Sequence, residues 1–109
     1  MKILCLSDLH LRMNDVFDAI HQKRFTPLLQ SIRDLAEDTK PDVAVVTGDI
    51  VPPPFVSSLN ALFGSLFPSE LPVVATLGNH EFWGRPFEET LEEARNQNVS
   101  APNVHILDA

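Results

Sequence analysis

Four short apolar runs divide the chain, and helical patterns of apolar residues occupy the intervals between them. Each run is bounded by turn-forming residues, and three of the four are rich in Val or Ile, as buried strands are. Strands that alternate with helices favour an α/β fold, in which right-handed β-α-β units build a mainly parallel sheet. The predicted strands are Ile3–Leu6, Val43–Thr47, Val73–Leu77 and Val104–Leu107.

The intervals carry start and stop signals typical of helices. Thr26 is placed to cap a helix that begins at Pro27, because Ser and Thr favour the cap position and Pro the first turn. The triple proline at 52–54 predicts an extended lead-in to the next helix. Glutamates follow Pro86, where negative charge suits the start of a helix. The predicted helical segments are 15–22, 27–40, 56–67 and a segment that starts near Pro86, so the order is βαβαβαβ.

Composition predicts one acidic domain over residues 1–109. The 8 basic and 15 acidic residues give a net charge of −7, which disfavours nucleic acid and anionic membranes as partners but leaves a nucleotide open as a substrate. No apolar run is long enough for a membrane span, and the apolar start is too short for a signal peptide. Cys5, the single cysteine, is expected in the core, and a chain without an internal disulfide fits the cytoplasm.

Potential metal ligands follow each of the first three predicted strands. Asp8 and His10 come after the first strand, Asp49 after the second, and Asn79 and His80 after the third. The carboxyl ends of parallel strands share one edge of the sheet, where ligands bind. If the segment after the first strand is extended, Asp8 and His10 point to the same side and can hold one cation. A carboxylate such as that of Asp49 could then bridge to a second cation.

Each of these residues alone has a simpler interpretation. Asp8 or Asp49 could be a turn former or a helix cap, Asn79 could complete a turn after Gly78, and His80 could be a surface histidine. A preference for turns does not explain why all three strands are followed by residues that can bind metal ions. The joint pattern therefore favours a metal site. Its oxygen and nitrogen donors suit manganese, iron or zinc.

The motifs Asp8-Leu9-His10, Gly48-Asp49 and Gly78-Asn79-His80-Glu81 resemble, in order, the first metal-binding blocks of the calcineurin-like metallophosphoesterases. The resemblance implies phosphoester hydrolysis, by phosphomonoesterase or phosphodiesterase action, with two divalent metal ions; manganese is the expected ion, with iron, zinc or magnesium as alternatives. It implies metal ligation by Asp8, His10, Asp49 and Asn79. It also implies that His80 is catalytic, contacting phosphate and protonating the leaving group, and that Glu81 helps to orient the site.

The resemblance covers the amino-terminal half of the family's domain, which in full is a four-layer αββα sandwich. The family's later histidines, including a G-H-x-H-like block, are absent from these residues. Half of such a sandwich would expose one face of its sheet, so we expect self-association or a complementing carboxy-terminal half, and weak metal binding without it. The alternative is a non-catalytic scaffold or fragment that binds a protein partner. Substrate identity stays open.

Overall fold

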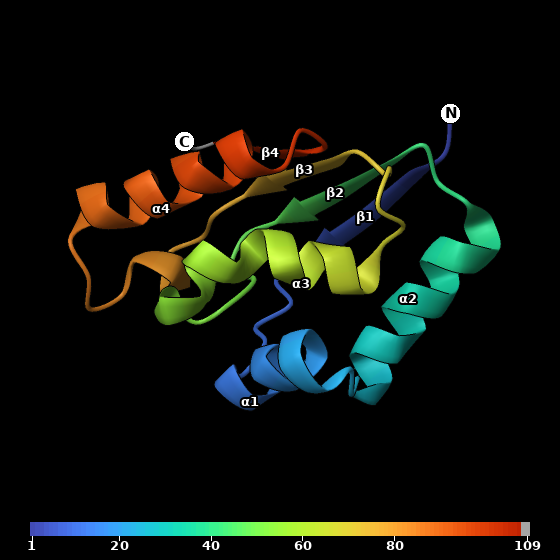
Figure 1. The fold of residues 1–109 in the computed structure, drawn as a ribbon, viewed down its shortest axis with the longest axis horizontal. Helices are drawn as coiled ribbons and strands as arrows, with labels where there is room; N and C mark the ends of the chain where they lie inside the picture. Colours follow the sequence, from blue (N-terminus) through green and yellow to red (C-terminus); the bar gives the residue numbers. More distant parts are fainter. Residues whose placement is uncertain (108–109) are drawn as a thin grey trace.

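The sheet is parallel throughout, and its four strands lie side by side in the order in which the chain visits them. The computed structural model describes residues 1–107, and the sheet order is β1-β2-β3-β4 (Figure 1). This arrangement confirms the predicted α/β fold with a parallel sheet and flanking helices. The strands are β1 (Ile3–Ser7), β2 (Val43–Thr47), β3 (Val73–Thr76) and β4 (Val104–Ile106).

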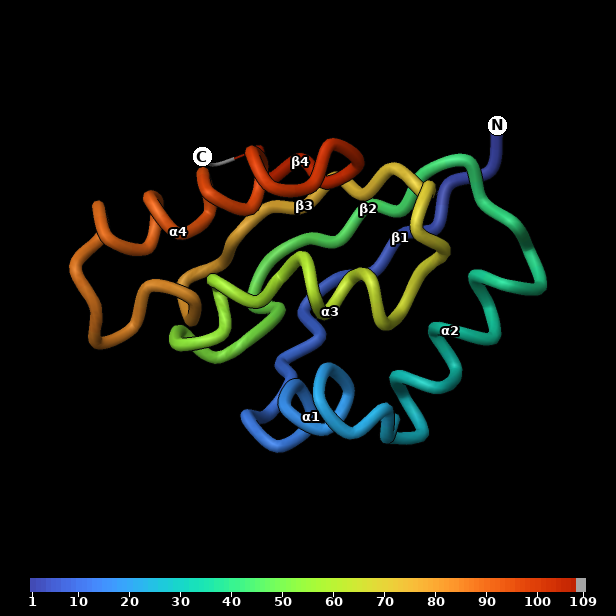
Figure 2. The backbone as a smooth tube through the Cα atoms, viewed as in Figure 1, coloured from blue at the N-terminus to red at the C-terminus, as the bar shows by residue number. Residues whose placement is uncertain are grey.

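Helices form every crossover between strands, and Figure 2 lets the path be followed from blue to red across the sheet. The first crossover has two helices, the second a short turn followed by a helix, and the third another short turn and a long helix. They are α1 (Met13–Phe17), the π-helical turn η1 (Asp18–Gln22), α2 (Pro27–Thr39), the 3₁₀ turn η2 (Pro53–Ser58), α3 (Leu59–Leu66), the 3₁₀ turn η3 (His80–Phe82) and α4 (Phe87–Ser100).

The helix α2 begins and ends where the sequence predicts, with Thr26 as its cap and Lys40 just after its last residue. The Thr26 hydroxyl oxygen accepts the N–H of Leu29 at 3.2 Å, and Pro27 occupies the first turn. Lys40 ends the helix in the left-handed conformation, with φ 47°, and its N–H donates to the carbonyl of Ala36. The helix buries Leu29, Ile32 and Ala36 on one face.

The triple proline departs from the predicted extended lead-in. Only Pro52 is extended, with ψ 153°, and the 3₁₀ turn η2 begins at Pro53. Proline fits a first helical turn because its φ is already close to the helical value and its missing N–H would have no partner there. The helical region therefore starts earlier than the apolar pattern indicates, and it becomes α-helical only at Leu59.

One face of the sheet carries the core and the other lacks a covering layer among residues 1–107. Sequential parallel strands joined by right-handed crossovers place all their helices on the same side. The burial of the strands alternates accordingly: Ala44 and Val46 are completely buried, while Ile3 is 54% exposed and Val45 is partly exposed. Cys5 lies on the open face and is exposed, so the expectation that it is a core residue was wrong.

Within residues 1–107, no helix combines the length and the apolar character that crossing a lipid bilayer requires. The longest, α4, has 14 residues and begins with glutamates. This agrees with the absence of a long apolar run in the sequence.

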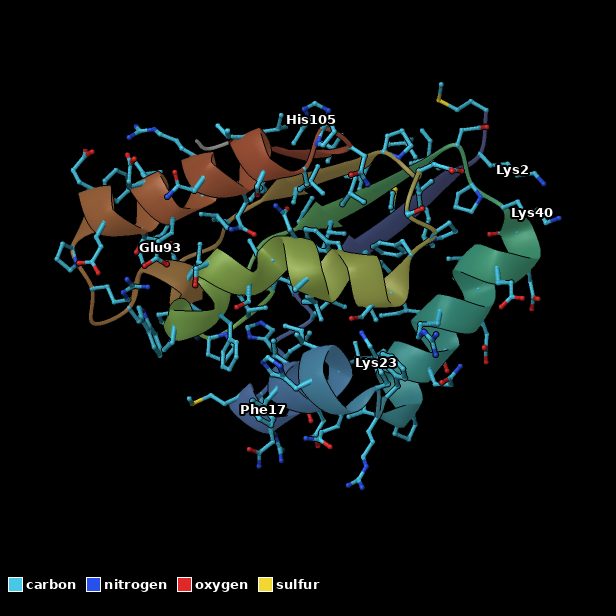
Figure 3. All side chains as sticks on the ribbon, in the orientation of Figure 1. Lys2, Phe17, Lys23, Lys40, Glu93 and His105 are labelled. Carbon is cyan, nitrogen blue, oxygen red and sulfur yellow. The ribbon has the colours of Figure 1, made fainter. Side chains whose placement is uncertain are left out.

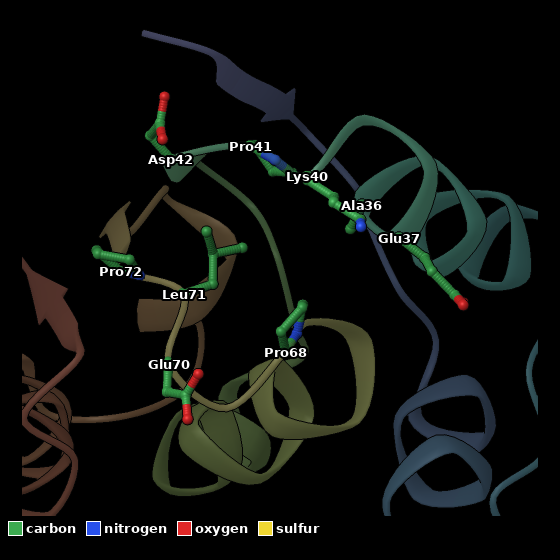
Figure 4. Close-up of a pocket in the computed structure, with 9 residues that line it drawn as sticks. All are labelled: Ala36, Glu37, Lys40, Pro41, Asp42, Pro68, Glu70, Leu71 and Pro72. Carbon is green, nitrogen blue, oxygen red and sulfur yellow. The ribbon is translucent and has the colours of Figure 1, made fainter.

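A cavity of about 480 Å³ opens at the amino ends of the strands, between the end of α2 and the segment that precedes β3 (Figure 4). Asp42 and Pro72, which line it, come immediately before β2 and β3. The side chains that follow the strands, where the sequence predicts the site, lie at the opposite edge of the sheet. The cavity is lined by Ala36, Glu37, Lys40, Pro41, Asp42, Pro68, Glu70, Leu71 and Pro72.

Because β2 has one buried and one open face, a Val-to-Thr substitution should lower the free energy of unfolding more on the buried face than on the open face. Val46→Thr places a hydroxyl in the buried core and should lower the free energy of unfolding by about 1–3 kcal/mol, because the hydroxyl loses its hydration. Val45→Thr, at the next residue on the open face, should change it by about 0.5 kcal/mol or less. Urea unfolding followed by circular dichroism measures both, and equal losses would contradict the assignment of the faces.

Candidate metal centre

Hydrogen bonds continue the alignment of the strands beyond their ends, and they fix the loops that follow. The N–H of Asp8 donates to the carbonyl of Thr47 at 3.0 Å, and that of His10 to the carbonyl of Asp49 at 2.8 Å. The N–H of Gly48 donates to the carbonyl of Thr76 at 2.9 Å. We call residues 8–12 the β1 loop, residues 48–51 the β2 loop and residues 77–86 the β3 loop. Backbone pairing thus holds the three loops side by side.

The β1 loop is not the extended segment that the sequence argument assumed. Asp8 and His10 both have left-handed φ angles, 51° and 47°, and Asp49 has φ 45°. Only Lys23 and Lys40, each at the end of a helical segment, share this conformation among the described non-glycine residues. Left-handed backbone is strained for side chains with a Cβ and is concentrated at functional sites. The spacing argument for pairing Asp8 with His10 was therefore wrong in its geometry, because the backbone turns at both residues.

His10, Asp49 and His80 bring potential metal-binding atoms together. One nitrogen or oxygen from each lies within 4.8 Å of the other two. Nε2 of His10 is 3.9 Å from Oδ2 of Asp49, and Nδ1 of His80 is 3.1 Å from Oδ1 of the same carboxylate. The carboxylate of Asp49 therefore lies between two imidazoles, with one oxygen directed to each.

The surroundings of Asp49 favour its charged form. The backbone N–H of His80 donates to its Oδ1 at 2.9 Å, and this bond, with help from the imidazoles of His80 and His10, holds the pKa of Asp49 below its ordinary value against the effect of burial. The carboxylate is consequently ionised at neutral pH. An ionised carboxylate is the form that binds a divalent cation.

The donor set fits a divalent metal ion. Nδ1 of His80 is buried, and the polar atom recorded near it among the described residues is Oδ1 of Asp49 at 3.1 Å. Imidazole nitrogens and an ionised carboxylate are ordinary ligands of manganese, iron and zinc. His10 and Asp49 would hold such an ion, with the imidazole of His80 beside it.

Asp8 lies outside this group of His, Cys, Asp and Glu side chains, and Asn79 lies beside His80 on the β3 loop. Asp8 points toward the β2 loop, where its Oδ1 would lie 3.4 Å from a Cβ placed on Gly48. Asn79 precedes η3, and its side chain does not cap that turn. The structure thus gathers His10, Asp49 and His80 closely, with Asp8 and Asn79 on the same loops.

Glu81 is completely buried beneath the site. Its Oε1 accepts the N–H of Gly78 at 2.6 Å, and its Oε2 accepts the N–H of Val51 at 3.0 Å. Burial raises the pKa of this carboxyl group, and the backbone donors oppose that rise. Asp49 accepts an N–H from the β3 loop and Glu81 accepts one from the β2 loop, so the two loops hold each other. We call this pair of contacts the reciprocal clasp.

A pocket of about 240 Å³ opens over the three clustered side chains. Apolar residues of the β1 and β2 loops form the rest of its wall. It is lined by His10, Leu11, Asp49, Val51, Pro52 and His80. The pocket has room for a phosphoryl group and part of its ester. A ligand bound in it would contact the imidazoles of His10 and His80.

Arg85 supports the β3 loop, and the sequence analysis did not single it out. Its guanidinium donates to the carbonyl of Pro53 at 3.0 Å and pairs with Glu89 and Glu93 of α4, which raise its pKa. Figure 3 shows Glu93 on the side of α4 that faces this loop. A signal was present, since an arginine just before a helix with glutamates four and eight residues on can pair with both.

The other two histidines do not contribute to the cluster. His21 contacts Phe17 in the first crossover, with ring centroids 4.6 Å apart, and His105 lies on β4 (Figure 3). Both were expected to be incidental to the site. Neither belongs to the group of potential ligands around Asp49.

The fold and this cluster together define a parallel α/β protein with a candidate metal centre at the carboxyl ends of its strands. Residues 1–108 match the family model described as calcineurin-like phosphoesterase, and the chain belongs to that family. Members of this family are typically hydrolases of phosphoesters and generally use divalent metal ions. No curated protein sequence matches the chain in a direct comparison.

The close approach of Gly78 to Asp49 predicts that the site does not tolerate alanine there. A Cβ at position 78 would lie 2.7 Å from Cγ of Asp49 and closer still to its Oδ1 and backbone nitrogen. Gly78→Ala should therefore displace Asp49 and lower the free energy of unfolding by about 1–3 kcal/mol.

Gly64, inside α3, is the matched control, because a Cβ there meets nothing within 4 Å. Gly64→Ala should raise the free energy of unfolding by about 0.5–1 kcal/mol, as alanine is the better helix former. Chemical denaturation compares the two variants. A Gly78→Ala variant as stable as the parent would contradict the tight approach described above.

Proposed function

We propose that this chain provides half of a two-metal phosphoesterase site, with Asp8, His10, Asp49 and Asn79 as metal ligands. The observation that carries the proposal is the ionised carboxylate of Asp49 between the imidazoles of His10 and His80. Asp8 and Asn79 flank that carboxylate on the neighbouring loops, where each could complete the coordination of one ion. Manganese is the proposed ion, in keeping with the mixed oxygen and nitrogen donors.

The proposed reaction is hydrolysis of a phosphomonoester or phosphodiester. Two divalent cations, when bound, neutralise phosphate oxygens and lower the pKa of a water molecule at the site. Water supplies the new P–O bond, and the bond from phosphorus to the leaving oxygen breaks. His80 donates the proton that the leaving oxygen takes up. Its exposed ring borders the pocket, so it can meet that oxygen directly.

The remaining residues of the site keep these groups in place. The backbone N–H of His80 orients Asp49 and favours its ionised form. Glu81 ties the β3 loop to the β2 loop, so that His80 and Asp49 keep their separation. The apolar wall of Leu11, Val51 and Pro52 excludes water from one side of the pocket.

We further propose that a complementing carboxy-terminal half covers the open face of the sheet and supplies further histidines to the metals. Two observations support this: the open face pairs Ile3 with Val43 and Cys5 with Val45, and the group of His, Cys, Asp and Glu ligand atoms found among the described residues contains just three side chains. An apolar sheet face without a covering layer also favours self-association. The acidic surface and single cysteine support a cytoplasmic location.

The function predicts manganese-dependent release of p-nitrophenol from a p-nitrophenyl monoester or a bis-p-nitrophenyl diester. His80→Ala should lower kcat about 10²- to 10⁴-fold, because the leaving oxygen loses its proton donor. Asn79→Ala should raise the manganese concentration needed for half-maximal rate. His21→Ala, a histidine remote from the pocket, is the control and should leave both quantities unchanged.

A non-catalytic scaffold would give the opposite pattern. If a folded protein, supplied with its complementing half, turns over neither ester with manganese, iron, zinc or magnesium, the hydrolase proposal is wrong. Binding of a partner protein would then be the function to pursue, since the open sheet face would remain as the feature to explain.

A further inference from the structure

An exposed tryptophan stands beside the proposed catalytic histidine. The side chain of Trp83 is 63% exposed, although tryptophan is a residue that folding usually covers. Its ring centroid lies 4.1 Å from that of His80, with the planes tilted by 47°. The exposure of this large apolar ring next to His80 therefore needs an explanation.

The residues on either side of Trp83 are anchored, and the indole itself contacts the His80 ring while it stays open to solvent. Phe82 stacks on Phe87 of α4, with centroids 4.9 Å apart and planes 19° from parallel. Arg85, on the other side, is bound to the carbonyl of Pro53 and to the glutamates of α4. The N–H of Trp83 also donates to the carbonyl of His80 at 3.2 Å. An exposed aromatic ring on an anchored backbone can bind another ring with less loss of entropy than one on a mobile segment.

The contacts between neighbouring rings show on which side of the proposed phosphate position Trp83 lies. His10 contacts His80 edge to face, with centroids 5.1 Å apart, and His80 contacts Trp83. Asp49 lies between the two imidazoles, so a phosphoryl group bound there has the indole on the His80 side. His80 is the proposed proton donor to the leaving oxygen, and the leaving group therefore extends toward Trp83.

We propose that Trp83 is a specificity-determining residue that stacks on a planar aromatic ring in the leaving group of the substrate. The preferred substrates are phosphoesters whose alcohol portion carries such a ring, as a nucleoside or an aryl alcohol does. Stacking on an aromatic side chain tolerates many rings, because every base has a π face. This inference rests on the proposed hydrolase function and adds the substrate class to it.

The kinetic test compares substrates that differ only in the ring. AMP and ribose 5-phosphate share their phosphate and sugar, and benzyl phosphate and butyl phosphate form a second pair without a sugar. In the protein completed by its second half, Trp83→Ala should raise the KM of the ring-bearing substrate of a pair about tenfold. The KM of the substrate without the ring should stay unchanged. Trp83→Phe, which keeps a ring, should retain most of the preference.

The outcomes separate a recognition role from a structural one. A loss confined to the AMP pair assigns the ring to a nucleoside, and a loss in both pairs assigns it to aromatic alcohols in general. An equal loss of activity on all four substrates, or no change in the ratio within either pair, would overturn the proposal, since a merely structural residue does not distinguish them.

Fluorescence keeps the proposal testable if no ester is turned over and the hydrolase proposal fails. Trp83 is the only tryptophan in a chain without tyrosine, so emission excited at long wavelength reports on this one side chain. Titration of the full chain with AMP in the presence of manganese should quench this emission, and ribose 5-phosphate at the same concentrations should not. Equal responses to the two, or no response to either, would overturn the stacking proposal independently of activity.

Discussion

The reciprocal clasp between the β2 and β3 loops is the interaction on which the candidate site depends. Asp49 accepts an N–H from His80, and Glu81 accepts one from Val51, so each loop carries a carboxylate that binds the backbone of the other. A hydrogen bond to an ionised carboxylate, such as that of Asp49, is stronger than one between neutral groups. A hydrogen bond made away from water, as at buried Glu81, is strengthened by the low dielectric. The clasp fixes the distance between Asp49 and His80, and it does so before any ion binds.

Several contacts around the clasp hold strained backbone in the loops. Asp8, His10 and Asp49 all have left-handed φ angles, and such residues persist only where their surroundings overdetermine them. Backbone pairing beyond the ends of β1 and β2 does this for the β1 loop, while Gly78 permits the close approach of the β3 loop to Asp49. The left-handed turns at His10 and Asp49 and the close approach of Gly78 to Asp49 thus bring the ligand atoms of His10, Asp49 and His80 together at one edge of the sheet. The exposed ring of Trp83 lies beside them.

The sequence predicted the strands and their alternation with helices well, because buried strands require runs of Val and Ile whose ends are marked by turn residues. It placed Asp49 and His80 at neighbouring strand ends for the same reason. It could not predict the left-handed turns at Asp8 and His10, since these depend on hydrogen bonds to a loop about forty residues away. Cys5 was misplaced because apolar residues on an uncovered sheet face look the same in sequence as those in a core. The role of Arg85 was overlooked although Glu89 and Glu93 follow it at helical spacing, and its bond to the carbonyl of Pro53, 32 residues away, left no local signal.

The central claim is that Asp49 lies where a divalent cation binds, with His10 on one side and the β3 loop on the other. X-ray diffraction at the manganese absorption edge, from crystals grown with that ion, tests it most directly. The account predicts an anomalous peak within coordinating distance of the Asp49 carboxylate and of the His10 imidazole. Ordered manganese bound elsewhere on the chain, with Asp49 well resolved and without a cation, would contradict it.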